Sequence, residues 1–357
     1  MFSLRRPRNS WTASSALQNF TGEYNFTIKT GQRLYKPSAT EPPNVNVAEN
    51  GAADHPLGRR HKNVCLKTGY FAAVMSLFVT SLNSGSNGNC YYVGNETEAV
   101  LIDAGISCKE IELRMKRLQL SPSKLKAIFI SHEHADHIRG LDVFSRKYSL
   151  PVYITAPTLR FGRVRLDRKL ACSFEAHTTV SVGSLQVVAF PKAHDASDPY
   201  SFTVSNGKVR VGVFTDIGVP CQNLIQHFSQ CHAAFLESNY DEEMLDKGSY
   251  PYYLKHRIRG GKGHLSNRQA LELFVKHRPS YLSHLFLSHL SRNNNCPKLV
   301  EELFNQHAGS THIIIASRDA ETPVYEVRAS DVAAKTVYIN SPLPLSAPPP
   351  QLSFDFC

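Results

Sequence analysis

The chain has 357 residues, of which 42% are hydrophobic, and a formal net charge of +10 at pH 7, so it can bury the core of one large domain or two ordinary ones. No apolar stretch approaches the roughly 20 residues that span a bilayer, and the beginning of the chain lacks the apolar segment of a secretory signal, which argues against a membrane or secreted protein. The eight cysteines form no CxxC pair, which argues against a zinc ribbon or a disulfide framework and favours a cytoplasmic protein with reduced thiols.

The first 74 residues differ in composition from the rest of the chain. They are rich in Ser, Asn, Thr, Pro and Gly and show no sustained apolar period. They also hold ten basic and four acidic residues, so +6 of the net charge lies here and +4 in the remainder. We interpret residues 1–74 as a disordered leader or the product of a misassigned start codon, with Met75 directly before the first predicted strand. An organellar transit peptide is the alternative, because the first 22 residues contain no acid.

From residue 76 onward, short β-rich runs alternate with amphipathic helical stretches. Strands are predicted at 77–81, 90–93, 99–103, 127–130, 152–155, 185–190, 201–204, 209–215, 233–237, 281–288 and 312–316, and helices at 109–120, 137–148, 220–228, 267–277 and 297–306. This order predicts an α/β protein with layered sheets. The Pro-rich stretch 341–352 cannot pack as helix or strand, so residues 336–357 are expected to form a disordered tail.

The strongest chemical signal is the pattern H-x-H-x-D-H directly after an apolar predicted strand, formed by His132, His134, Asp136 and His137. Residues two apart on an extended segment project to the same side, so His132 and His134 can approach one metal ion. Asp136 and His137, at the turn into a helix, are displaced and can reach a second ion. Imidazole and carboxylate ligands together suit Zn²⁺, Mn²⁺ and Fe²⁺. A polar surface loop is the alternative, but such a loop has no reason to follow a buried strand with this spacing.

This pattern resembles that of the metallo-β-lactamase superfamily, and the resemblance extends from about residue 76 to residue 312. Further motifs appear in the order found in that superfamily: LIDAG (101–105), KAHDASDP (192–199), FTDIG (214–218) and LSHLS (287–291). The resemblance implies an αββα sandwich of two mixed sheets flanked by helices, formed by a hydrolase domain of residues 75–335.

The resemblance also implies two divalent metal ions per chain, of Zn, Mn or Fe. Residue by residue, the implied ligands are His132, His134 and His194 for one ion, Asp136, His137 and His289 for the other, and Asp216 as a bridge between them. Asp103 is expected to orient the histidine loop by hydrogen bonding rather than to bind metal. Taken alone, His194 could be a loop histidine, Asp216 a helix N-cap and Asp103 a turn residue.

The branch of the superfamily is indicated by spacing and by further motifs. Only 73 residues separate Asp216 from His289, which is too short for the inserted domain of β-CASP nucleases. β-Lactamases usually lack the last histidine of the pattern and flavodiiron proteins replace the second with Glu, whereas this chain has both His134 and His137. The segments LESNYD (236–241) and GHLSN (263–267) resemble motifs of RNase Z, and the chain is most similar to the bacterial YycJ/WalJ group of exonucleases.

By this resemblance, Glu237 orients His264, and His264 contacts the scissile phosphate or protonates the leaving oxygen. Asp136 or Asp216 is expected to take up or orient the proton of the attacking water. The structural alternatives are a strand-end carboxylate for Glu237 and a helix-entry residue for His264, with Ser266 as the N-cap.

Substrate contacts are predicted at two loops. Ser84, Ser86 and Asn87, in the glycine-bearing loop SGSNGN, could hold a phosphate or form an ordinary hairpin turn. Asn293 and Asn294 could donate to a phosphate or cap the following helix. Four basic residues near the motifs could bind flanking phosphates or be solvated surface charges; they are Arg139, Lys192, Lys262 and Arg292.

The resulting expectation is a dinuclear metal-dependent phosphodiesterase, a DNA or RNA exonuclease in which a hydroxide between the two metals attacks phosphorus. A hydrolase of small or cyclic phosphodiesters is the alternative within the same fold. A non-catalytic nucleic-acid-binding module is disfavoured, because all seven ligand positions are filled. The sequence leaves the oligomeric state open.

Overall fold

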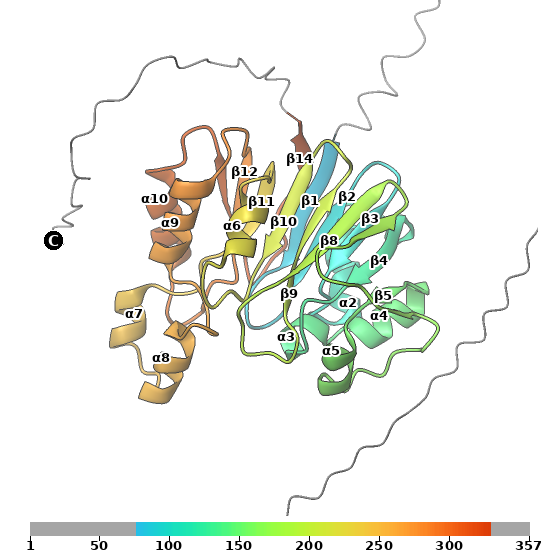
Figure 1. The fold of residues 1–357 in the computed structure, drawn as a ribbon, viewed down its shortest axis with the longest axis horizontal. Helices are drawn as coiled ribbons and strands as arrows, with labels where there is room; N and C mark the ends of the chain where they lie inside the picture. Colours follow the sequence, from blue (N-terminus) through green and yellow to red (C-terminus); the bar gives the residue numbers. More distant parts are fainter. Residues whose placement is uncertain (1–75, 330–357) are drawn as a thin grey trace, which may run out of the picture. The chain divides into compact units, whose positions relative to one another are not determined.

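The computed structural model describes residues 76–329. The predicted leader and the predicted Pro-rich tail fall outside these described residues. Within them, two seven-stranded sheets pack face to face with helices on their outer sides (Figure 1). The predicted α/β class and αββα sandwich are therefore confirmed.

The first sheet is mixed, with strand order β14-β1-β2-β3-β4-β5-β6. Strands β14, β1, β2 and β3 pair antiparallel, whereas β3 to β6 run parallel. Its strands are β1 (Ser76–Asn83), β2 (Cys90–Gly94), β3 (Ala99–Ile102), β4 (Leu125–Phe129), β5 (Val152–Tyr153), β6 (Ala171–Cys172) and β14 (Tyr325–Arg328).

The second sheet repeats this arrangement, with strand order β13-β12-β11-β10-β9-β8-β7. Strands β7 to β10 pair antiparallel, and β10 to β13 run parallel. Its strands are β7 (Thr179–Val182), β8 (Leu185–Pro191), β9 (Tyr200–Ser205), β10 (Arg210–Phe214), β11 (Ala233–Glu237), β12 (His284–Ser288) and β13 (His312–Ile315).

The central core lies between the two sheets and is built from apolar side chains that alternate along each strand. On β8, Leu185, Val187 and Ala189 face this core, as the period of two in a strand requires. Aromatic contacts join the sheets, with ring centroids of Phe129 and Phe202 5.7 Å apart. Burial of this apolar surface is the main stabilising contribution to the sandwich.

Helices cover both outer faces (Figure 1). Residues of α2 (Cys108–Arg117) and α4 (Leu141–Tyr148) pack on the first sheet, and residues of α6 (Gln222–Phe228), α9 (Asn267–His277) and α10 (Pro297–Asn305) pack on the second. The N-cap of α9 is Ser266, in a capping box with Gln269. None of the described helices is long and apolar enough to cross a membrane.

The predicted helix 137–148 is wrong in one respect, because it is two helices, α3 (Ala135–Ile138) and α4. Gly140 interrupts it by donating its N–H to Ala104 O, and a Cβ at this position would lie 2.0 Å from Ile106 O. The prediction also missed several short elements: a 3₁₀ turn (Pro122–Lys124), α5 (Ala156–Phe161), β6, β7, α7 (Glu242–Lys247) and α8 (Tyr252–Arg259).

Candidate metal centre

The candidate residues lie at the carboxyl ends of strands from both sheets, where the chain leaves each strand. Three of them adopt left-handed backbone conformations: Asp103 after β3 (φ 62°), Asp216 after β10 (φ 55°) and His289 after β12 (φ 56°). This conformation is uncommon for residues other than glycine and persists where the surrounding structure enforces it. Here it turns each side chain out of its strand and toward the other candidates.

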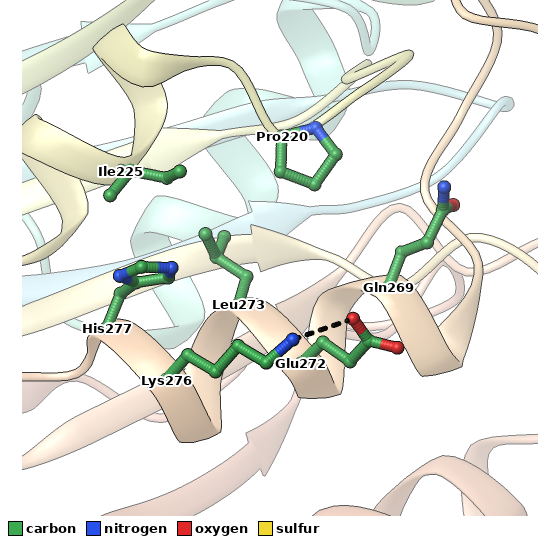
Figure 2. A pocket seen from close by; sticks show the side chains of 7 residues that line it. All are labelled: Pro220, Ile225, Gln269, Glu272, Leu273, Lys276 and His277. Atoms are coloured by element: carbon green, nitrogen blue, oxygen red, sulfur yellow. Dashed lines mark hydrogen bonds and ion pairs between the residues drawn. The ribbon is translucent and has the colours of Figure 1, made fainter.

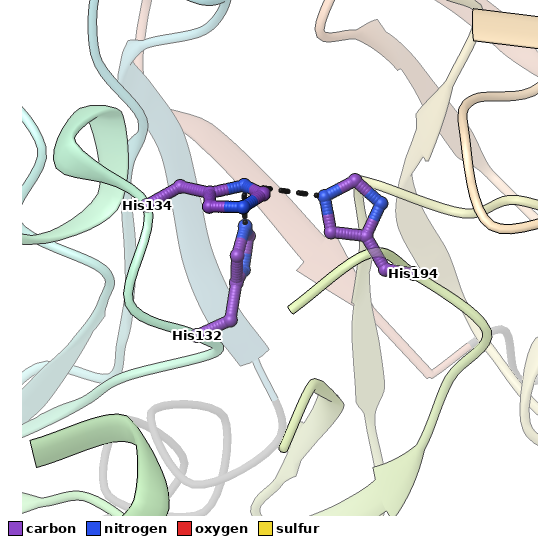
Figure 3. Close-up of side chains that lie close together, drawn as sticks. All are labelled: His132, His134 and His194. Carbon is purple, nitrogen blue, oxygen red and sulfur yellow. Dashed lines mark hydrogen bonds between the residues drawn. The ribbon is translucent and has the colours of Figure 1, made fainter. Parts of the chain in front are cut away.

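Three histidines form the first cluster (Figure 3). Nε2 of His132 lies 3.1 Å from Nδ1 of His134, and Nε2 of His194 lies 3.4 Å from that same Nδ1. Nδ1 of His194 lies 3.0 Å from Gly263 O, so it carries the proton and leaves the Nε2 lone pair facing the cluster. Burial lowers the pKa of His132 and lowers that of His194 to about 4. Neutral imidazoles with converging nitrogens can bind a metal ion.

The second cluster consists of Asp136, His137 and His289. Nε2 of His137 and Nε2 of His289 each lie 3.6 Å from Oδ2 of Asp136. Asp216 lies between the two clusters, because its Oδ2 is 3.2 Å from Nε2 of His137 while its Oδ1 is 3.7 Å from Nε2 of His194. The seven predicted ligands are therefore brought together, and one carboxylate faces both groups.

Two observations indicate that these residues can bind divalent metal ions. Asp216 Oδ2 and His289 Nε2 are buried and make no hydrogen bond within the described chain, which indicates a partner other than an amino acid. Burial alone would lower the pKa of His137, yet the carboxylates around it, Asp216 first, raise it to about 10. Such a concentration of negative charge attracts cations, and the imidazole and carboxylate set suits Zn²⁺, Mn²⁺ or Fe²⁺.

Asp103 lies beside His137, behind the second cluster. Its carboxylate accepts hydrogen bonds from Ser131 N and Ser131 Oγ, both at 2.8 Å, and lies 2.7 Å from Nδ1 of His137. The contact holds the His137 ring with Nε2 toward Asp216. This is the hydrogen-bonded arrangement that orients a metal-binding histidine.

Asn89 is a site residue that the sequence analysis missed. Its Nδ2 lies 3.2 Å from Oδ2 of Asp136 and 3.1 Å from Nε2 of His137, and its Oδ1 accepts a hydrogen bond from Gly85 N. The available signal was its position as the last residue of the SGSNGN loop. That loop was predicted to hold a phosphate or to form an ordinary hairpin turn.

Glu237 connects two histidines at the end of β11. Its Oε1 lies 2.8 Å from Nδ1 of His264 and 3.0 Å from Nδ1 of His289, and its Oε2 accepts hydrogen bonds from Ile217 N and Leu265 N. Burial would raise the pKa of Glu237, but the two histidines lower it to about 2. His264 is the exposed member of this group, with 21% of its side chain accessible. The contact of Glu237 with His289 was not expected from the sequence.

The predicted substrate contacts are not gathered into one surface. The Ser84 hydroxyl is buried and accepts a hydrogen bond from His289 N. Asn294 is buried, Asn87 donates to Arg318 O, and Asn293, which is exposed, donates to the Tyr250 hydroxyl.

Ser86 is exposed on its loop. Helix α10 begins at Pro297 and has Cys296 as its N-cap, so neither Asn293 nor Asn294 caps it.

The four predicted phosphate-binding cations differ in their exposure to solvent. Lys192 is buried and donates to Thr215 O, and burial lowers its pKa, so it is neither a surface charge nor available to a phosphate. Arg139 is exposed and donates to Asn87 O, while Lys262 and Arg292 are exposed.

Two cavities differ in their position relative to the candidate metal centre. One, of about 250 Å³, lies between α6 and α9 and is lined by Pro220, Leu273 and the ion-paired Glu272 and Lys276, and no candidate metal ligand lines it (Figure 2). The other, of about 350 Å³, is bounded by Ser84 and by residues 290–292, directly after His289. Of these two, the second adjoins the candidate metal centre.

Comparison with known proteins gives consistent matches. The profile of the metallo-beta-lactamase superfamily matches residues 84–219. Exodeoxyribonuclease YycJ of Bacillus anthracis is 34% identical over 237 residues, which cover 65% of this chain and 89% of that protein. Exodeoxyribonuclease WalJ of Streptococcus pneumoniae is 31% identical over 261 residues, covering 69% and 96%. The solved structure of YhfI, a metallo-beta-lactamase fold protein from Bacillus subtilis, superposes with a TM-score of 0.55 at 17% identity, covering 71% and 99%.

Proposed function

Because the chain belongs to the metallo-β-lactamase superfamily and is a metal-dependent hydrolase, we propose that it is a dinuclear phosphodiesterase that degrades nucleic acid from an end, with DNA as the preferred substrate. The observation that carries this proposal is the position of Asp216, one oxygen of which faces His137 and the other His194. A carboxylate placed between two ligand groups is what a two-metal site requires. YycJ and WalJ, which are named exodeoxyribonucleases, support DNA as the substrate.

In this proposal His132, His134 and His194 would hold one ion, and Asp136, His137 and His289 would hold the other. Asp216 would serve both groups. When bound, the two ions polarise the phosphodiester and lower the pKa of a water molecule. The ring nitrogens and carboxylate oxygens converge within 4.8 Å in each group.

The protein's own groups handle the protons and the substrate. Asp136 is partly exposed, so it can orient the attacking water or accept its proton. Glu237 holds Nδ1 of His264, which directs Nε2 of the same ring away from the carboxylate. A partly exposed imidazole held in this way can contact the phosphate or protonate the leaving oxygen.

The proposal is tested by incubating end-labelled linear DNA and RNA with the purified protein, with Mn²⁺ or Zn²⁺ and with a chelator. Stepwise shortening from one end that the chelator abolishes supports it. Internal cleavage would support an endonuclease instead, and no cleavage of either polymer would contradict the nuclease assignment.

A further inference from the structure

A strongly basic segment begins in the last turn of α5 and continues into the following loop, close to the metal centre. Residues 160–169, here called the basic loop, carry five cations and one acid, for a net charge of +4. All five cations are exposed, and none forms an ion pair within residues 76–329. The cations are Arg160, Arg163, Arg165, Arg168 and Lys169. The charge of this loop equals the whole net charge of the chain after residue 74. Unpaired arginines gathered in this way are the usual partners of a phosphodiester backbone.

The basic loop is packed against the histidine loop. A Cβ added to Gly162 would lie 3.2 Å from Cβ of Glu133, which stands between His132 and His134, and 3.0 Å from Cδ1 of Ile138. Glu133 in turn accepts a hydrogen bond of 2.7 Å from Ser197 N. Arg163 directly follows Gly162, and the contact residue Glu133 lies between two candidate metal ligands in the sequence.

Helix α8 carries exposed aromatic and basic side chains beside the same centre. Tyr252 and Tyr253 are 82% and 73% exposed, the highest values among the large hydrophobic residues of the described chain, and α8 buries none of its side chains. Arg257 Nε lies 2.5 Å from Oδ2 of Asp195, the neighbour of His194. Figure 1 shows α8 and α5 at the same edge of the sandwich, with α3 between them. Both tyrosine rings are exposed to solvent, and no side chain of α8 is buried in the core. Rings exposed in this way are available to stack on a ligand.

We propose that the basic loop and α8 form the two ends of a track that binds single-stranded nucleic acid across the metal centre. The loop contacts phosphates, and Tyr252 and Tyr253 stack on bases. The combination of a positively charged path with exposed aromatic rings is how proteins bind single strands without sequence preference. A duplex would not offer its base faces to the tyrosines. The position of the scissile bond on this track rests on the proposed function, whereas the binding of the strand does not.

Binding can be measured separately from cleavage, by fluorescence anisotropy of a labelled single-stranded DNA with the full chain in the presence of a chelator. The variant Arg163→Ala/Arg165→Ala/Arg168→Ala should weaken binding at least about ten-fold and lower the slope of log Kd against log salt by about 2, since each lost contact to a single strand contributes about 0.7. A matched control removes three exposed lysines elsewhere: Lys126→Ala/Lys208→Ala/Lys276→Ala. If both variants weaken binding equally, the effect is one of net charge and the track is wrong.

The tyrosines are tested by comparing Tyr252→Ala/Tyr253→Ala with Tyr252→Phe/Tyr253→Phe. Loss of the rings should weaken binding of single-stranded DNA at least about five-fold, whereas the phenylalanine variant should bind like the parent protein, because stacking needs only the ring. Equal binding by all three would exclude α8 from the track.

Hydrolysis of bis-p-nitrophenyl phosphate should be unchanged in the tyrosine and arginine variants, because this small diester does not reach the track. If the parent protein binds strands as expected but hydrolyses no diester, the proposed function fails while this inference stands. If it hydrolyses diesters but no variant changes strand binding, the inference alone fails.

Discussion

Nδ1 of His264 lies 2.8 Å from Oε1 of Glu237, a carboxylate that is fully buried at the end of β11. Because the two backbone N–H groups of Ile217 and Leu265 hold Oε2 of the same carboxylate, Glu237 cannot rotate away from the histidine. Two roles for His264 remain distinguishable by experiment. It can act on the substrate, or it can join Asp216, Glu237 and His289, whose ligand atoms also converge.

The variant His264→Ala should keep its metals and lose turnover. A residue that acts on the leaving group contributes about 10²- to 10⁴-fold to the rate, so kcat should fall by at least 100-fold. His134→Ala is the matched comparison, since it removes a nitrogen from the first histidine cluster and should lose both metal and activity. Metal content by elemental analysis, measured together with kcat, separates the two. Equal metal loss in both variants would reassign His264 as a ligand.

Replacing Asp103 by Asn should weaken metal binding without removing a ligand. The carboxylate lies 2.7 Å from Nδ1 of His137 and fixes that ring. Loss of such a supporting contact typically costs 10- to 100-fold in metal affinity. Competition with a chromophoric chelator measures this affinity. An unchanged affinity in Asp103→Asn would mean that the His137 ring is held by other contacts.

Metal removal should destabilise the folded protein, and reconstitution should restore about two ions per chain. The site gathers several buried carboxylates, and bound cations compensate their charge. A ligand at a thousand-fold excess over its Kd stabilises the native state by about 4 kcal/mol. Thermal denaturation with and without chelator, and elemental analysis after dialysis, measure both effects. Saturation at one ion per chain would contradict the dinuclear assignment.

His227 predicts a pH dependence of stability that is independent of the metal centre. Its ring stacks on Phe190 with centroids 4.1 Å apart, and burial, followed by the charge of Arg210, lowers its pKa to about 4. In the unfolded chain a histidine titrates near pH 6.5. As pH falls below 6.5, His227 therefore binds a proton in the unfolded state, whereas in the folded state it does not bind one until about pH 4.

Between pH 6.5 and 4 this proton uptake should reduce the free energy of unfolding by about 2 to 3 kcal/mol. His227→Gln should remove that part of the pH dependence, which urea denaturation at pH 7 and pH 4.5 measures. His307→Gln, at an exposed position, is the matched control. The same loss of stability at pH 4.5 in His227→Gln and in the parent protein would show that this ring is not responsible.

Much of the fold was predictable because its strands carry local apolar patterns. The predicted strand 233–237 and helix 267–277 have the bounds of β11 and α9. The short elements α7 and α8 escaped prediction because six to eight residues with few buried side chains leave no period to detect.

The candidate site likewise contains residues that could be predicted from the sequence and residues that could not. Ligands at strand ends follow motifs that lie within a few residues of one another, so the sequence analysis could name them, and their roles stay predictions. The surroundings of Ser84 could not be foreseen, since its hydroxyl meets His289 N, 205 residues later in the chain. Asn89 likewise meets Asp136 and His137 only through folding. The Ser84 contact depends on how the two sheets pack, and the Asn89 contacts depend on the order of strands within the first sheet.

One side-by-side assay tests the central claim most directly. The purified protein is incubated with end-labelled linear DNA, RNA, bis-p-nitrophenyl phosphate, a cyclic nucleotide and a thioester, with Mn²⁺ and with chelator. We expect chelator-sensitive degradation of nucleic acid from a 5′ end, with DNA preferred, and its loss in His134→Ala. Hydrolysis confined to the cyclic nucleotide would favour a small-diester hydrolase. Hydrolysis of the thioester alone would contradict the phosphodiesterase assignment and leave only the fold in place.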